Sequence, residues 1–233
     1  MRCCIAHTLA VIALWASPLV AKPTFSDAKR ELKYLYFFLD SSFQKDFYCH
    51  IPFSVRLKNG KPHLQPKPSG IKDAKAIEWE HIMPAHTFGK HLACWARGGR
   101  KNCRRDPFFQ KMESDVQNIV PTLAKINRDR GNYAYTNAPK SLRFTQYGSC
   151  QVYVDTKAQR FYPAMYSKGY IARSYLYMAK MYNIPLDSKT LAQMQEWNTA
   201  YPMTKQEQYL RTQLDMINQK LILQALPFGR LLR

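Results

Sequence analysis

Residues 77–84 read Ile-Glu-Trp-Glu-His-Ile-Met-Pro, and the rest of the chain is best interpreted from this stretch. Polar and apolar residues alternate as in a β-strand, and Pro84 ends the strand because proline has no amide hydrogen to donate. The alternation puts Glu78 and Glu80 on one face and His81 on the other, unless the strand bends or ends there. A carboxylate beside a neutral imidazole can hold a hard cation and take a proton from water. An isolated Glu-His pair is usually a solvated pair, so this stretch alone does not define a site.

The segment that follows this strand is strongly basic. Residues 97–105 contain five Lys or Arg around the pair Gly98-Gly99, whose backbone can approach a phosphate closely. Arg100 suits the role of a guanidinium that neutralises charge on a phosphate. Its neighbours are candidates for contacts with backbone phosphates, against the alternative of a solvated basic loop: Arg97, Lys101, Arg104 and Arg105. Oxygen and amide side chains that could act as ligands or orienting groups follow at Glu113, Asp115, Asn118 and Asn127.

The charge of the whole chain agrees with this basic loop. The 233 residues contain 35 Lys and Arg against 16 Asp and Glu, a net charge of +19, and the sequence pI is about 9.8. Such a surface attracts polyanions, either nucleic acid or an anionic membrane. No segment carries the amphipathic basic helix that would favour a membrane.

The first residues are typical of a secretory signal peptide. Arg2 precedes an apolar run from Ile5 to Trp15, which is too short to span a membrane, and small residues lead to Ala21. We expect residues 1–21 to be removed and residues 22–233 to form one domain, exported to the periplasm or the medium.

Cleavage after Ala21 leaves four cysteines, and an even number in an exported protein suggests two disulfides with three possible connectivities. A local Cys94–Cys103 bond is favoured, which leaves Cys49–Cys150 as a long-range bond. A zinc site is the alternative, because His86 and His91 lie close in sequence to Cys94 and Cys103.

Hydrophobic spacing predicts a helix-rich α+β chain. A helix is expected from a Ser26 cap to about residue 40, followed by an extended, Pro-rich segment at 47–70. Strands are expected at 76–83 and 147–155, with an irregular loop at 88–107. Further helices are expected at 107–118, at the start of 122–132, and at 171–182, 188–201 and 204–223.

Several motifs, in order, resemble the endonuclease I family, which consists of periplasmic or secreted bacterial nucleases of the ββα-metal, or His-Me finger, class. The similarity extends from about Phe47 to Tyr182. The motifs that carry it are Ile77-Glu78-Trp79-Glu80-His81, Cys94-Trp95, Gly98-Gly99-Arg100-Lys101-Asn102-Cys103, Lys111-Met112-Glu113-Ser114-Asp115 and Asn127-Arg128-Asp129-Arg130-Gly131-Asn132.

This resemblance implies a ββα-metal core within a mostly helical single domain. It also implies a metal-dependent endonuclease that cleaves DNA, and also RNA, with little sequence specificity and leaves 5′-phosphate ends. The expected partner is the phosphate backbone of nucleic acid, without membrane binding, and the expected state is a monomer.

Roles for individual residues follow from the same resemblance. His81 matches the general base, and Glu80 and Asn127 match the ligands of a single divalent cation, Mg²⁺ or another such as Mn²⁺ or Ca²⁺. Arg100 matches the residue that stabilises the phosphate, and Glu113 matches a supporting acid. Asn118 either orients the loop that carries the base or has the ligand role given to Asn127.

A non-catalytic, basic nucleic-acid-binding or DNA-uptake protein is the alternative function. It predicts the same charge and the same export. It differs in one respect, because it does not require His81, Glu80 and Asn127 to come together in one site.

Overall fold

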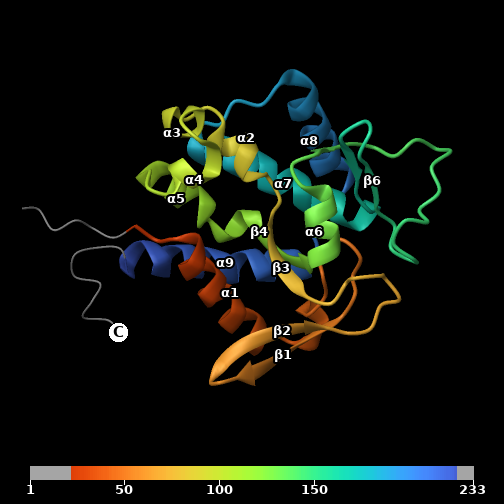
Figure 1. Cartoon of the computed structure of the whole chain (residues 1–233), viewed down its shortest axis with the longest axis horizontal. Coiled ribbons are helices and arrows are strands. Elements are labelled where there is room, and N and C mark those ends of the chain that lie inside the picture. The colour runs from red at the N-terminus through yellow and green to blue at the C-terminus, as the bar shows by residue number, and fades with distance from the viewer. Residues whose placement is uncertain (1–21, 225–233) are drawn as a thin grey trace, which may run out of the picture.

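The computed structural model describes residues 22–224. Its central element is an antiparallel pair of strands, β3 (Ile77–His81) and β4 (Ile119–Leu123), in which Glu80 lies opposite Val120. The helix α6 (Ala124–Arg130) follows β4 without a loop and packs against both strands (Figure 1). The predicted leader, residues 1–21, lies outside the described part of the chain, and the single domain over residues 22–233 stays a prediction.

The 37 residues between β3 and β4 form an insert of short helices. These are α2 (Ala85–Gly89), α3 (Ala93–Ala96), α4 (Gly99–Cys103), α5 (Pro107–Glu113) and a 3-10 helix (Val116–Asn118). The prediction of an irregular loop at 88–107 is therefore wrong, since helices of four or five residues are too short to show a hydrophobic period. The predicted helix at 107–118 divides at Ser114, because the Asp115 carboxylate accepts a hydrogen bond from Gln117 N and starts the 3-10 turn.

An N-terminal helix and a β-hairpin pack together beside the central strands. The helix α1 (Phe25–Phe38) is capped by Thr24, which forms a capping box with Asp27, so the predicted Ser26 cap is wrong. The segment expected to be only extended forms the strands β1 (Phe53–Lys58) and β2 (Lys61–Pro66), joined at Asn59-Gly60. Both turn residues have positive φ, which Asn and Gly tolerate best.

The C-terminal third confirms the predicted helices. They are α7 (Met165–Tyr182), α8 (Ser188–Ala200) and α9 (Lys205–Gln224). A small sheet precedes them, with the strands β5 (Ala134–Tyr135), β6 (Tyr153–Asp155) and β7 (Arg160–Tyr162) in the order β5-β7-β6. Of the strand predicted at 147–155, only the last three residues form a strand, β6. Among residues 22–224, no helix combines the length and the apolar character needed to cross a membrane.

Two disulfides connect these parts, Cys49–Cys150 and Cys94–Cys103, and both are the predicted pairings. The first closes 101 residues of sequence and the second joins α3 to α4. Because Cys94 and Cys103 are bonded to each other, the zinc alternative is wrong. The prediction of a helix-rich α+β chain is confirmed.

Candidate active site

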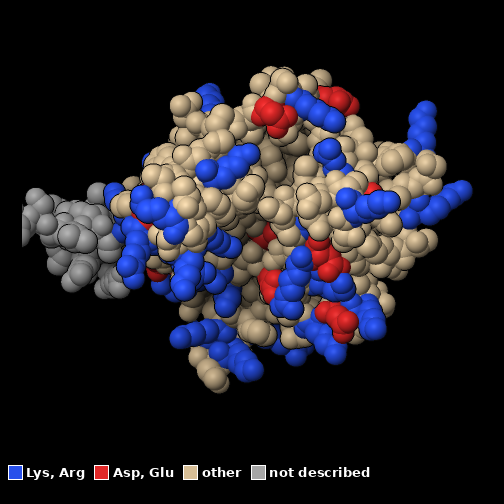
Figure 2. Space-filling view, turned by 45° about the horizontal axis from the view of Figure 1, so that its top comes forward, with Lys and Arg blue, Asp and Glu red and all other residues tan. Residues whose placement is uncertain are grey.

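A cavity of about 280 Å³ brings together residues from β3, α4 and α6. Its walls include four of the predicted site residues, Glu80, His81, Arg100 and Asn127. Figure 2 shows one face of the molecule hollowed near its centre, with acidic side chains in the hollow and Lys and Arg side chains crowded beside and below it. Because β3 ends at His81, the strand alternation no longer separates His81 from Glu80, and both side chains border the same space.

The imidazole of His81 is held in one tautomer. Its Nε2 lies 2.8 Å from the backbone carbonyl oxygen of Glu113, and since a carbonyl only accepts, Nε2 carries the hydrogen. The other nitrogen, Nδ1, is then the basic one. Burial lowers the pKa of His81 to about 3, and the cations Arg100 and Arg130 lower it too, so the ring is neutral at pH 7. The Phe25 ring packs against it, with centroids 4.6 Å apart.

The carboxylate of Glu80 is fixed through one of its two oxygens. Oε1 accepts hydrogen bonds from Tyr48 Oη at 3.1 Å and from Arg130 Nη1 at 2.8 Å. Oε2 has no hydrogen-bond partner among residues 22–224. Burial raises the pKa of Glu80, while the Arg130 guanidinium and the Tyr48 hydroxyl act in the opposite direction. The carboxylate therefore presents one oxygen to the cavity and anchors the other.

The amide of Asn127 is oriented by Glu78, which is not one of the predicted site residues. Its Nδ2 donates to Glu78 Oε2 at 3.0 Å, which leaves Oδ1 as the oxygen available to a ligand. Arg128 binds the other oxygen of Glu78, with Nε at 3.1 Å. Glu78 thus sets the direction of Asn127 from the neighbouring strand.

Arg100 enters the cavity from the insert, and Glu113 holds it there. Arg100 Nε donates to Glu113 Oε1 at 2.6 Å, and its guanidinium lies 5.6 Å from the centre of the Phe25 ring. Glu113 does not border the cavity. Its side chain contacts Arg100 while its backbone oxygen holds His81, so one residue positions both.

Asn118 lies at the base of the insert and does not border the cavity. Its Oδ1 accepts from Met83 N at 2.7 Å and its Nδ2 donates to Met83 O at 3.0 Å. Its backbone oxygen also accepts from Ile82 N at 3.0 Å. These bonds fix the chain just after His81.

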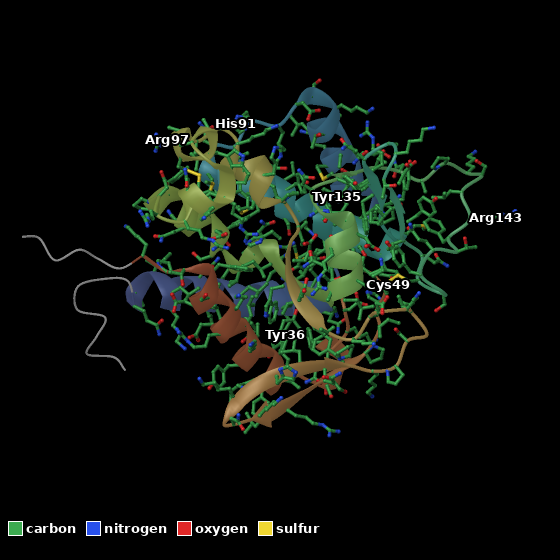
Figure 3. The ribbon with its side chains drawn as sticks, in the orientation of Figure 1. Tyr36, Cys49, His91, Arg97, Tyr135 and Arg143 are labelled. Atoms are coloured by element: carbon green, nitrogen blue, oxygen red, sulfur yellow. A yellow bond between two sulfur atoms is a disulfide. The ribbon has the colours of Figure 1, made fainter. Side chains whose placement is uncertain are left out.

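The other predicted phosphate contacts lie outside the cavity. They are Arg97, Lys101, Arg104 and Arg105, and all four are exposed on the helices α3 and α4 or directly after them. Figure 3 shows Arg97 at the outer edge of the molecule. The structure therefore places one cation of this basic loop, Arg100, in the cavity.

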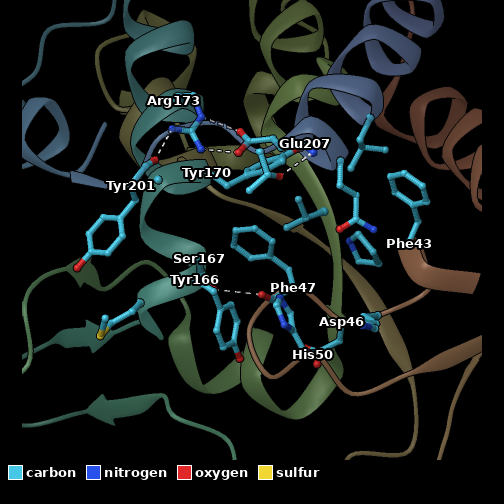
Figure 4. A pocket seen from close by; sticks show the side chains of 18 of the residues that line it. Phe43, Asp46, Phe47, His50, Tyr166, Ser167, Tyr170, Arg173, Tyr201 and Glu207 are labelled. Carbon is cyan, nitrogen blue, oxygen red and sulfur yellow. Dashed lines mark hydrogen bonds and ion pairs between the residues drawn. The ribbon is translucent and has the colours of Figure 1, made fainter. Parts of the chain in front are cut away.

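A larger cavity, of about 480 Å³, lies elsewhere. Its walls include Asp46, His50, Tyr166 and the ion pair between Arg173 and Glu207 (Figure 4). None of the predicted site residues borders it. Size is thus a poor guide here, because the chemistry is concentrated in the smaller cavity.

The donor atoms of the smaller cavity suit a hard divalent cation. Glu80 Oε2 and Asn127 Oδ1 are oxygens without hydrogen-bond partners in the described chain, and Mg²⁺ prefers oxygen ligands while keeping several waters. Within residues 22–224 no group of three or more His, Cys, Asp or Glu could hold a metal.

Three residues that support the site were not predicted as part of it: Tyr48, Glu78 and Arg130. Arg130 is buried, and beyond Glu80 it donates to the backbone oxygens of His81 at 3.2 Å and Ile82 at 2.9 Å. The position of Arg130 in the motif from Asn127 to Asn132 is the one sequence feature that indicates a role for it, but the motif does not show which residues it contacts.

An imidazole, two oxygen donors and a guanidinium in one cavity are the groups that the hydrolysis of an anionic ester requires. Comparison with known proteins identifies the family: residues 38–217 match the model of the family Endonuclease I, and the chain belongs to that family. The resemblance drawn from the motifs is confirmed.

Individual relatives agree with this family. Endonuclease-1 of Buchnera aphidicola subsp. Baizongia pistaciae (strain Bp) is 40% identical over 165 residues, which is 69% of this chain and 67% of the relative. A periplasmic deoxyribonuclease of Aeromonas hydrophila is 36% identical over 208 residues, covering 86% and 85% of the two chains. An extracellular deoxyribonuclease of the same species is 36% identical over 185 residues, covering 77% and 78%.

Proposed function

We propose that this protein is an exported endonuclease that hydrolyses phosphodiester bonds of DNA with the help of one divalent cation. The observation that carries the proposal is the cavity that joins His81, with Nδ1 as its basic nitrogen, to Glu80, Asn127 and Arg100. The names of the relatives support DNA as substrate and the periplasm or the medium as location. Two disulfides agree with an oxidising compartment.

In this proposal His81 is the general base. Its Nδ1 takes a proton from the attacking water, while its Nε2–H continues to donate a hydrogen bond to the Glu113 carbonyl oxygen, which keeps the ring in place. The charge that forms on the imidazole is costly in a buried site, which favours rapid return of the proton. Glu113 and Asn118 act as positioning residues, since their contacts hold the base and Arg100 in place.

Glu80 Oε2 and Asn127 Oδ1 would hold the cation, and Mg²⁺ is our candidate. A bound cation supplies positive charge to the phosphate and to the departing 3′ oxygen, which leaves a 5′-phosphate end on the product. Arg100, which lies in the insert between β3 and β4, neutralises negative charge on the phosphate. We therefore propose the β3–β4–α6 unit as the ββα-metal core.

Recognition in this model depends on phosphates and not on bases. The exposed cations Arg97, Lys101, Arg104 and Arg105 lie on the insert that carries Arg100. Contacts with the backbone hold little sequence information, so cleavage should show little sequence preference and extend to RNA. We propose a monomer, since one chain contains the whole cavity.

Incubation with supercoiled plasmid distinguishes this enzyme from a non-catalytic DNA-binding or DNA-uptake protein. We expect nicked and linear products when purified protein is given Mg²⁺ and no products in EDTA. Binding in EDTA should persist and weaken steeply with salt. Binding without cleavage in the presence of Mg²⁺, Mn²⁺ or Ca²⁺ would instead establish the non-catalytic alternative.

Glu78 provides a test of the proposed cation ligands. The substitution Glu78→Ala removes the acceptor that orients Asn127, and loss of such a supporting contact typically lowers metal affinity about 10–100-fold. The Mg²⁺ concentration for half-maximal cleavage should rise accordingly, and high Mg²⁺ should restore most of the rate. The exposed Glu196→Ala is the matched control for the charge change. If Glu78→Ala needs no more Mg²⁺ than the unmodified protein, the proposal that Glu78 orients Asn127 for cation binding is wrong.

A further inference from the structure

A second cavity, of about 360 Å³, adjoins the catalytic one. The two share three wall residues, Phe25, Trp79 and Asn127. The second cavity extends from this shared wall along α1 to the hairpin, where Lys29, Lys33 and His63 border it. A substrate strand that leaves the catalytic cavity on this side therefore meets a basic surface.

The basic side of α1 follows a single helical stripe. Phe25, Lys29 and Lys33 are spaced by four residues and so lie one above another. The adjoining side of the helix, with Ala28 and Leu32, is buried in the core. The helix is thus fixed in rotation, and its two lysines are held towards the cavity.

These lysines are not engaged by acidic side chains. Within residues 22–224 the ion pairs of α1 are formed by Arg30, Asp27 and Glu31, and none includes Lys29 or Lys33. The acidic residue that borders the second cavity, Glu78, is already bound by Arg128 and Asn127. The positive charge of the stripe is therefore available to a ligand.

Phe25 links the stripe to the catalytic residues. Its ring contacts His81 in the first cavity, and Lys29 Nζ lies 4.7 Å from its centre. The guanidinium of Arg100 contacts the same ring at 5.6 Å. The Phe25 ring therefore lies close to one cation of the first cavity, Arg100, and to one cation of the stripe, Lys29.

The hairpin continues the basic surface beyond α1. His63 pairs with Arg56 across the strands, and paired residues project on the same face. That face also carries Lys58 and Lys61, and all four side chains are exposed. Residues 47–72 contain five Lys or Arg and no Asp or Glu. The other face is anchored, since Phe53 and Leu64 pack against Tyr36 and Leu39 of the α1 segment.

We propose that α1 and the β1–β2 hairpin form a second binding surface for the sugar-phosphate backbone, separate from the basic loop of the insert. This α1–hairpin surface comprises Phe25, Lys29, Lys33, Arg56, Lys58, Lys61 and His63. It guides the strand next to the cleaved bond, with Phe25 against the adjoining nucleotide and the cations on successive phosphates. The inference rests on the proposed function for the identity of its ligand.

The double variant Lys29→Gln with Lys33→Gln tests this surface by binding alone. Affinity for a short DNA duplex is measured in EDTA by fluorescence anisotropy over a series of salt concentrations. Each lost phosphate contact makes the slope of log affinity against log salt less negative by about 0.9, so the double variant should change it by about 1.8. Adding Arg56→Gln and Lys58→Gln should reduce the slope further.

The matched control is Lys180→Gln with Lys189→Gln, which removes the same charge at the α7–α8 corner, far from the hairpin in Figure 1. Its slope should stay close to that of the unmodified protein. Equal slopes for the two double variants would overturn the α1–hairpin surface. Failure of the proposed function has a separate signature, the absence of Mg²⁺-dependent plasmid cleavage by the unmodified protein, and the slopes are measured without cleavage.

Discussion

His81→Ala should slow plasmid cleavage by roughly 10²–10⁴-fold, the range typical of general-base catalysis. The variant lacks the imidazole whose Nδ1 is the proposed base. DNA binding in EDTA should largely survive, because the imidazole is neutral and makes no proposed phosphate contact. Initial rates at saturating Mg²⁺ measure the effect.

Two further variants separate the chemistry of His81 from its packing. His81→Asn keeps an amide that can donate to the Glu113 carbonyl but has no basic nitrogen, so it should be about as slow as His81→Ala. His91→Ala removes an exposed histidine of the insert and should leave the rate unchanged. Near-normal cleavage by both His81 variants, with normal unfolding transitions, would exclude His81 as the base.

Arg130→Met should lower the free energy of unfolding by about 3–5 kcal/mol, because it leaves the Glu80 carboxylate buried without its partner. The two side chains are 1% and 5% exposed, so water cannot replace the lost contact. The Met variant also removes the donors to the backbone oxygens of His81 and Ile82. Urea unfolding curves with linear extrapolation give the measurement.

Arg128→Met is the control on the same helix. Arg128 also pairs with a glutamate of β3, Glu78, but its side chain is 71% exposed, so its loss should matter far less. Adding Glu80→Gln to Arg130→Met should recover part of the lost stability, because no unpaired charge is then buried. A double variant no more stable than Arg130→Met would show that the penalty has another origin.

The sequence predicts the residues of the proposed active-site cavity better than the contacts that orient them. The motifs around Glu80, His81, Arg100 and Asn127 carry a family resemblance, and the structure brings these four together. The role of Arg130 is not visible in the sequence, because its partner lies 50 residues away and an arginine in a short helix normally faces solvent.

The missed elements of the fold have local reasons. The strand β4 contains Pro121, which normally argues against a strand. Here the Pro121 carbonyl points away from β3 and accepts a hydrogen bond from Phe47 N. The Pro121 nitrogen points the same way, so its lack of a hydrogen costs no hydrogen bond to β3. The hairpin has an Asn59-Gly60 turn, a strong hairpin signal, but its prolines hid the strand pattern.

The neck of the insert divides the protein into parts that can change separately. Asn118 forms two hydrogen bonds with the backbone of Met83, so the two ends of the insert, residues 82–118, lie side by side where they join the central strands. The two proposed cation ligands, Glu80 and Asn127, lie outside this neck, and Arg100 lies within it. The length and charge of the outer turns of the insert can therefore change in evolution, and with them the polyanions that the insert binds. The two proposed cation ligands need not change with them.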